Sequence, residues 1–323
     1  MITPRQAMAT IDQRFGRHPG YRALHAKGTI CRARFKATPV ASQLTRAKHM
    51  QSQAIEALVR FSNGNGPPAL PDHADSPRGM ATTFLLPDGG RTDILALTAP
   101  RFPARTAEGF IALLHATRPG PTMIPRVLLY LLRRPRALCP VLELIATSRP
   151  PSSYAACTYH ALHAFRWVAP DGSHRHVRYR WVPETVEAGI PSREARRRGP
   201  DYLQRDLDER LRRSPIRFTL KLQVAEPGDS VDDVSTVWPS GRQMIEAGLL
   251  EVTEVDTPPG PYSDRLVFDP TRLTDGIEAT ADPVLWFRTP VYELSATRRE
   301  LRARPGGRSS GHDTRGSEEE RTG

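Results

Sequence analysis

Residues 22–38 of the 323-residue chain read RALHAKGTICRARFKAT. From Thr29 to Thr38, apolar and polar residues alternate, as in a strand that buries one of its faces. The segment 22–28 before it places an arginine, a histidine and a lysine at the point where this strand begins. We therefore expect a β-sheet whose first strand follows a candidate functional loop.

Outward from this strand, the sequence predicts many short strands with helices inserted between them. A helix is expected over 4–15, with Ala7, Ile11 and Phe15 on one face. Further strands are expected over 57–62, 80–86, 93–97, 161–168, 176–182, 216–224, 249–255 and 266–268. Further helices are expected over 106–117, 125–134, 138–147 and 200–213, and from Pro290 with Thr289 as N-cap. This order favours an α+β fold, an antiparallel barrel or sheet decorated with helices.

Length and composition exclude several classes of protein. A chain with 38% hydrophobic and 25% charged residues can bury a large core. The most apolar window, 123–132, contains Arg126 and is about half the ~20 residues of a membrane-spanning helix. No export leader precedes the first helix, and Cys31, Cys139 and Cys157 are too scattered for a disulfide framework. We expect a cytoplasmic protein without a membrane span, and a disordered tail over 303–323.

The net charge of +11 comes almost entirely from arginine. Such an excess suits nucleic acid, an acidic membrane surface, or buried anionic groups held by guanidinium forks. The arginines are spread along the chain and do not interleave with aromatic residues, so no nucleic-acid partner is expected. A solvated basic surface is the simplest explanation. The pairs His160/His163 and His174/His176 lack a third ligand and are interpreted as core or surface histidines.

Three clusters remain as candidate chemistry: residues 22–28, Val59-Arg60-Phe61-Ser62 and Arg288-Thr289-Pro290-Val291-Tyr292. With Asp75-Ser76-Pro77-Arg78-Gly79-Met80-Ala81, their order and spacing resemble the haem-containing catalase superfamily, most closely its short catalase-related peroxidases. The resemblance extends from about Asp12 to Arg299. It implies one haem domain over 1–302, with an antiparallel β-barrel core, inserted and C-terminal helices, and haem b (iron) between barrel and helices.

The resemblance also implies a role for each site residue. Tyr292 would be the axial iron ligand and Arg288 its partner. A free tyrosine has a pKa near 10, so a phenolate ligand needs the help of Fe³⁺ and a nearby guanidinium. The remaining roles are these: His25 as the distal base, Ser62 orienting it, Arg22 and Arg60 pairing with haem propionates, and Phe110 stacking on haem or simply packing in the core.

One position departs from the family pattern. Counting back from Pro100, the distal asparagine of catalases falls at Leu97, which has no hydrogen-bond donor. Asn63 or Asn65 in a neighbouring loop is an alternative donor. We therefore expect weak disproportionation of H₂O₂ and a more apolar pocket that suits organic hydroperoxides.

The expected function is that of a haem peroxidase that reduces hydrogen peroxide or organic hydroperoxides with a small-molecule electron donor, as a monomer or homodimer. Two alternatives stay open. One is a catalase-like enzyme that rearranges fatty-acid hydroperoxides or oxidises a biosynthetic substrate, and the other is a non-catalytic haem-binding protein.

Overall fold

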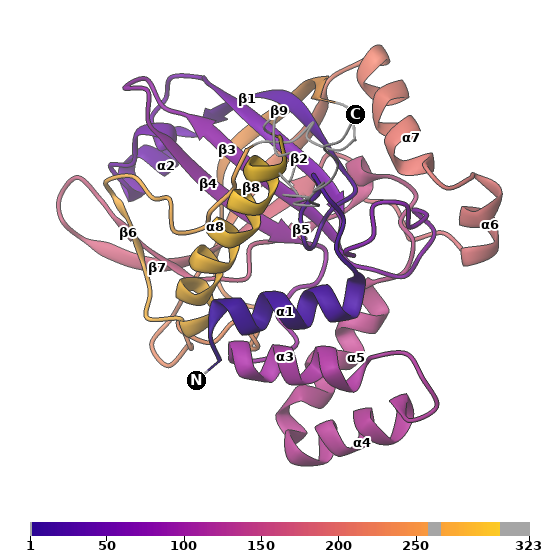
Figure 1. Ribbon diagram of the computed structural model, residues 1–323. Coiled ribbons are helices and arrows are strands. Elements are labelled where there is room, and N and C mark those ends of the chain that lie inside the picture. The colour runs from indigo at the N-terminus through magenta and orange to yellow at the C-terminus, as the bar shows by residue number, and fades with distance from the viewer. Residues whose placement is uncertain (1, 258–265, 304–323) are drawn as a thin grey trace, which may run out of the picture.

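Eight antiparallel strands form a closed barrel (Figure 1). The structure is a computed structural model, and residues 2–257 and 266–303 are described. The barrel order is β7-β5-β4-β3-β2-β1-β9-β8, and pairing of β7 with β8 closes it. The barrel strands are β1 (Gly28–Ala37), β2 (Ile55–Asn63), β3 (Arg78–Leu85), β4 (Arg91–Leu97), β5 (Tyr159–His160), β7 (His174–Pro183), β8 (Ile216–Val224) and β9 (Met244–Thr257). Beyond β7, the sheet continues with β6 (Phe165–Val168) and β10 (Ile277–Ala279).

Aromatic side chains fill the interior of the barrel. Phe35 contacts Phe84 and Trp181, with ring centroids 5.0 and 6.1 Å apart, and Phe61 contacts Phe218 at 5.9 Å. All five side chains are fully buried and pack edge-on or tilted against one another. Because the interior is packed, a haem-sized group has to lie outside the barrel wall.

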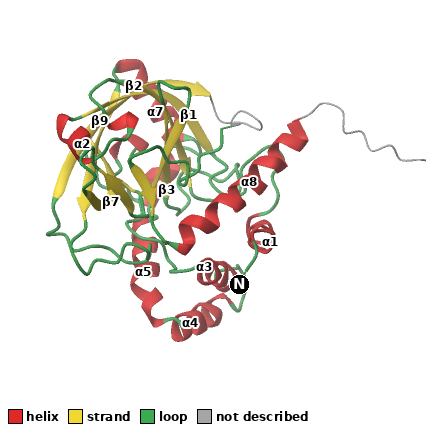
Figure 2. Cartoon of the chain, turned by 90° about the vertical axis from the view of Figure 1, so that its left-hand side faces the viewer, coloured by secondary structure: helices red, strands yellow, loops and turns green. Residues whose placement is uncertain are grey.

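One outer side of the wall is buried as well. In β2, Val59 and Phe61 belong to the interior core, so Arg60 and Ser62 point outward. Both are nevertheless only 4% exposed. Figure 2 shows helices α1 (Pro4–Phe15) and α8 (Pro283–Ala303) lying along one side of the barrel. The space between barrel wall and helices is therefore where polar residues of β2 are sequestered.

The remaining helices are insertions between strands. Between β4 and β5 lie α3 (Ala107–Ala116), α4 (Met123–Arg133) and α5 (Leu138–Thr147). Between β7 and β8 lie α6 (Ser192–Arg197) and α7 (Tyr202–Arg213), and α2 (Pro39–Leu44) follows β1. Short 3₁₀ turns occur at η1 (Lys48–Met50), η2 (Pro135–Ala137) and η3 (Tyr154–Ala156). The predicted α+β fold, a barrel with inserted and C-terminal helices, is confirmed.

Two element predictions are wrong. The last helix begins at Pro283 and not at Pro290, because Asp282 Oδ1 accepts hydrogen bonds from the amides of Val284 (2.8 Å) and Leu285 (3.4 Å). Pro290 lies inside α8, where it cannot donate a helical hydrogen bond and its ring crowds the carbonyl of the preceding turn. Residues 266–268, predicted as a strand, pair with no strand in the described part of the chain. They contact Arg22 instead, through the carbonyl of Leu266 and the ring of Phe268.

Two further expectations concern the C-terminal tail and the absence of a membrane-spanning helix. Of the tail predicted over 303–323, only Ala303 is described, as the last residue of α8; the rest lies outside the described residues. Among the helices of the described part, none is long and apolar enough to cross a membrane.

A buried histidine in the core makes stability depend on pH. His49 is 1% exposed and packs against Phe84 in a tilted arrangement, with ring centroids 4.7 Å apart; burial lowers the pKa of His49 from 6.5 to about 3. Between pH 3 and 6.5 the unfolded chain binds the extra proton, so the free energy of unfolding falls as the pH falls through this window. In urea unfolding between pH 4 and 6, His49→Gln should reduce this slope by up to about 1.4 kcal/mol per pH unit. The exposed His174→Gln is the control, and equal slopes for wild type and His49→Gln would contradict the prediction.

Candidate active site

A histidine–serine pair lies against the outer face of β2. His25 Nδ1 is 2.9 Å from Ser62 Oγ, so the loop before β1 is joined to the strand that neighbours it. The backbone of His25 has φ +56°, a left-handed conformation that is unusual for a residue with a side chain. Such strain costs about 1–3 kcal/mol and concentrates at functional sites. The structure thus brings together the two residues predicted for the distal side.

Two glycines make room for this arrangement. A Cβ on Gly79 of β3 would lie 2.8 Å from Ser62 Oγ and 2.9 Å from two ring atoms of His25. A Cβ on Gly28 would lie 2.6 Å from the guanidinium carbon of Arg60. These contacts give a steric reason for the glycine in each of the motifs HAKG and PRGMA.

Leu97 faces the same side of the sheet as the histidine–serine pair. Ser62 is paired with Gly79 on the neighbouring strand, and Gly79 with Leu97 on the next. Residues directly opposite one another in a sheet share a face, and Gly79 has no side chain to intervene. Leu97 also packs with the apolar group of Leu162, Val234, Val284 and Phe102. The apolar residue is therefore on the face of the sheet where the resemblance expects the distal asparagine.

The alternative that Asn63 replaces that asparagine is wrong. Asn63 alternates with Ser62 along β2, and its side chain donates to Asp72 (2.8 Å) and accepts from Tyr154 (2.8 Å). Asp72 also pairs with the buried Lys27 at 2.8 Å. Asn63 thus belongs to a structural network on the other side of the wall, and Asn65 contributes a backbone carbonyl to Ala26 (3.4 Å).

On α8, Arg288 and Tyr292 are joined by two hydrogen bonds. Arg288 Nε and Nη2 both donate to the hydroxyl oxygen of Tyr292, at 2.8 and 2.5 Å. The pair is one helical turn apart, so continuing α8 through Pro290 is what aligns the two side chains. The two guanidinium donors therefore fix the position of the Tyr292 oxygen relative to Arg288.

Two residues that the sequence analysis did not select hold Arg288 in place. Arg288 Nη1 lies 2.9 Å from His163 Nε2, and His163 Nδ1 lies 2.7 Å from Asp282 Oδ2. Because arginine only donates, Nε2 must accept, which leaves the ring proton on Nδ1 directed at Asp282. Burial lowers the pKa of His163, which favours this neutral form. His163 is thus a core histidine, as one interpretation held, and it also positions Arg288. In the sequence, the helix-start pattern Asp282-Pro283 was the signal that could have revealed its partner.

Positive charge converges on His25. Burial is the main cause that lowers the pKa of His25, to about 3. The positive charges of Arg60, Arg288 and Arg22 lower it further. Residues from the loop, from β2 and from α8 therefore surround one space. A group with a metal centre and two carboxylates fits this set, since the phenol can ligate the metal and the guanidinium groups can neutralise the carboxylates.

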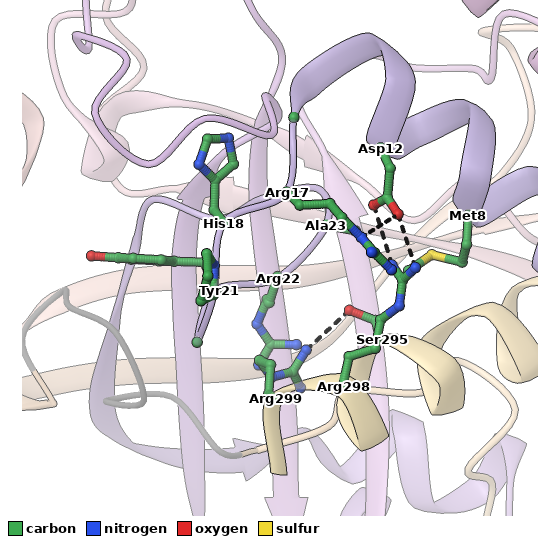
Figure 3. A pocket seen from close by; sticks show the side chains of 13 residues that line it. Met8, Asp12, Arg17, His18, Tyr21, Arg22, Ala23, Ser295, Arg298 and Arg299 are labelled. Carbon is green, nitrogen blue, oxygen red and sulfur yellow. Dashed lines mark hydrogen bonds and ion pairs between the residues drawn. The ribbon is translucent and has the colours of Figure 1, made fainter. Parts of the chain in front are cut away.

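A basic pocket opens beside this space (Figure 3). It lies between α1, residues 16–23 and α8, and its lining includes Arg22. Asp12 is its one acidic lining residue and binds Arg17 (3.0 Å) and Arg298 (2.8 Å). The excess of guanidinium groups suits an anionic group at this edge of the site.

Phe110 of α3 packs against Phe102, with ring centroids 4.8 Å apart. It also contributes to an apolar cluster with residues of α1 and with Phe287, Val291 and Leu294 of α8. This confirms a packing role beside the helix that carries Arg288, and contact with haem stays a prediction.

The chain belongs to the catalase family: the family profile described as Catalase matches residues 10–302. Two catalase-related peroxidases are similar to it. That of Mycolicibacterium paratuberculosis is 47% identical over 294 residues, covering 91% of this chain and 94% of the relative. That of Synechococcus elongatus is 34% identical over 302 residues, covering 92% and 89%.

Solved catalases share the fold. A fungal catalase superposes with a TM-score of 0.76 at 23% identity, and catalase A from Saccharomyces cerevisiae with 0.76 at 21%. The match covers 91% of this chain in both cases, but only 62% and 64% of the solved chains. The chain therefore spans less than two thirds of the length of these catalases.

Proposed function

We propose that this protein is a haem peroxidase that reduces hydrogen peroxide or organic hydroperoxides with an external small-molecule electron donor. The observation that carries the proposal is the pair of hydrogen bonds from Arg288 to the Tyr292 oxygen, close to the His25–Ser62 pair. The two similar proteins named catalase-related peroxidases support the same reaction class.

The residues present fit haem b. Tyr292 would supply an oxygen ligand to the iron, Arg22 and Arg60 would pair with the propionates, and Phe110 would pack on the porphyrin ring. When bound, haem supplies the redox-active iron at which the peroxide O–O bond is cleaved. Arg288 holds the Tyr292 oxygen through two hydrogen bonds, and the Asp282–His163 chain fixes the position of Arg288.

His25 would move the proton. Its depressed pKa keeps the ring neutral at physiological pH, so it can accept a proton from the peroxide. Ser62 engages Nδ1, which leaves Nε2 as the nitrogen for this transfer. The imidazole of His25 would then return the proton to the peroxide oxygen that leaves, while the external donor supplies the electrons.

Leu97 would set the preference among peroxides. A leucine on the face of the Ser62–Gly79 row adds apolar surface and no hydrogen-bond donor. Two molecules of H₂O₂ are then less well oriented for disproportionation, whereas an alkyl group of an organic hydroperoxide gains an apolar contact. We infer weak catalase activity beside the peroxidase activity.

We further propose a cytoplasmic location and a monomeric or homodimeric state. The three cysteines are free thiols, and burial raises the pKa of Cys31 and of Cys157 to about 12. Free thiols, among them the exposed Cys139, suit a reducing compartment.

Replacing the distal histidine tests the proposed reaction. In haem-loaded His25→Ala, peroxide-dependent oxidation of a phenolic donor should fall about 10²- to 10⁴-fold while haem is retained, because the proton acceptor is lost. His174→Ala, an exposed histidine, is the matched control. Full activity in His25→Ala would contradict the proposed role of His25 as the proton acceptor. Conversion of a lipid hydroperoxide without any reductant would favour rearrangement, and bound haem without turnover would favour a binding protein.

Restoring a donor tests the role of Leu97. In Leu97→Asn, oxygen release from H₂O₂ should rise about 10- to 100-fold, by analogy with donors that stabilise charge in other active sites. Leu95→Asn, two residues back on the same strand face but opposite Ala81, should leave oxygen release unchanged. An oxygen electrode measures both variants. No gain in Leu97→Asn would show that the missing donor does not limit disproportionation.

A further inference from the structure

Helices α4 and α5 expose two apolar stripes. On α4, Ile124 is 67% exposed, Leu128 56% and Leu132 79%, at intervals of four residues along one side. On α5, Leu138, Leu142 and Ile145 are 45%, 57% and 63% exposed. Isolated exposed leucines are ordinary, but six large apolar side chains on two consecutive helices form a surface that needs explaining.

The opposite sides of these helices are well packed. Tyr130 of α4 and Val141 of α5 are buried with Leu113 and Ala116 of α3. Arg134 also lies over the Tyr130 ring, 5.4 Å from its centroid. The helices are therefore fixed by their inner faces, and the apolar stripes are the sides turned to solvent. Figures 1 and 2 show α4 at the outer edge of the molecule, with α3 between it and α1.

The charge around the stripes is of one sign. Residues 109–142 contain no aspartate or glutamate, and they contain five arginines: Arg118, Arg126, Arg133, Arg134 and Arg136. Arg133 and Arg136 are exposed between the two stripes in sequence. Glu143, the next acidic residue, is already paired with Arg101 at 2.5 Å.

This charge pattern distinguishes between the partners that could cover the apolar stripes. A second copy of the chain in a two-fold interface would place the same arginines against each other, with no acidic residue in the segment to offset them. A partner that is apolar inside and anionic at its surface complements both features. Short helices with an apolar face and arginines beside it lie in the interface of anionic bilayers.

We propose that α4 and α5 are a membrane-docking surface for anionic phospholipid. The leucine and isoleucine side chains enter the boundary between headgroups and acyl chains, while Arg133 and Arg136 contact the phosphates and other anionic headgroup atoms. The contact between this surface and the membrane is peripheral and does not involve the haem chemistry. We therefore expect the protein to bind membranes in the absence of peroxide.

The test uses the haem-loaded full chain and sedimentation with phosphatidylcholine vesicles, with and without phosphatidylserine. The wild type should bind the vesicles that contain phosphatidylserine, and salt should weaken the binding. Arg133→Gln/Arg136→Gln should weaken it about 25-fold, from roughly fivefold per basic residue near an anionic surface. Arg196→Gln/Arg197→Gln, an exposed arginine pair at the end of α6, should bind as the wild type does.

A second pair of variants tests the apolar stripes. Leu128→Ser/Leu132→Ser should weaken binding about tenfold or more because buried apolar area is lost. Val186→Ser/Val237→Ser, two exposed valines elsewhere, is the control. Absence of binding, equal binding to vesicles without phosphatidylserine, or insensitivity to both site variants would overturn the proposal. A further contradicting result would be a wild-type chain that does not bind vesicles but forms a dimer, if Leu128→Ser/Leu132→Ser dissociates that dimer.

Discussion

The site depends on the two hydrogen bonds that Arg288 donates to the Tyr292 oxygen. They require α8 to be helical on both sides of Pro290, so the helix has to start earlier, at Asp282-Pro283. Asp282 serves both needs: one carboxylate oxygen caps α8, and the other binds His163, which orients Arg288. The start of the helix and the position of the guanidinium are thus fixed by one buried carboxylate.

A second constraint comes from the barrel. Its aromatic interior leaves no room for a cofactor, so residues with site chemistry project outward from β2 and are buried under the loop and helices. The same strand serves two environments, with Phe61 inside and Ser62 outside. Gly79 then matters because any side chain there would displace His25 and Ser62. Close packing of the wall, and not the loop alone, sets the place of the distal histidine.

Local patterns predicted most of the fold. The helices 4–15 and 138–147 and the strand 216–224 have the predicted bounds, because their apolar periodicity is a local signal and Thr3 also caps the first helix. The start of α8 could not be read in this way, since Thr289-Pro290 and Asp282-Pro283 both fit a helix start. His163 was missed as a member of the site because its partners are 119 and 125 residues away in the chain. Among the site residues, spacing within a motif predicted Arg288 with Tyr292, whereas only tertiary contacts reveal what holds them.

We propose that the Tyr292 oxygen, held by two hydrogen bonds from Arg288, is the protein ligand of the haem iron. The most direct measurement is the absorption spectrum of the ferric, haem-reconstituted Tyr292→Phe variant beside that of the wild type. The control is Tyr130→Phe, which removes the buried hydroxyl of a tyrosine on α4. We expect a high-spin ferric spectrum for wild type and control, and a shifted spectrum or impaired haem loading for Tyr292→Phe. An unchanged spectrum with full haem loading in Tyr292→Phe would place the ligand elsewhere and contradict the account.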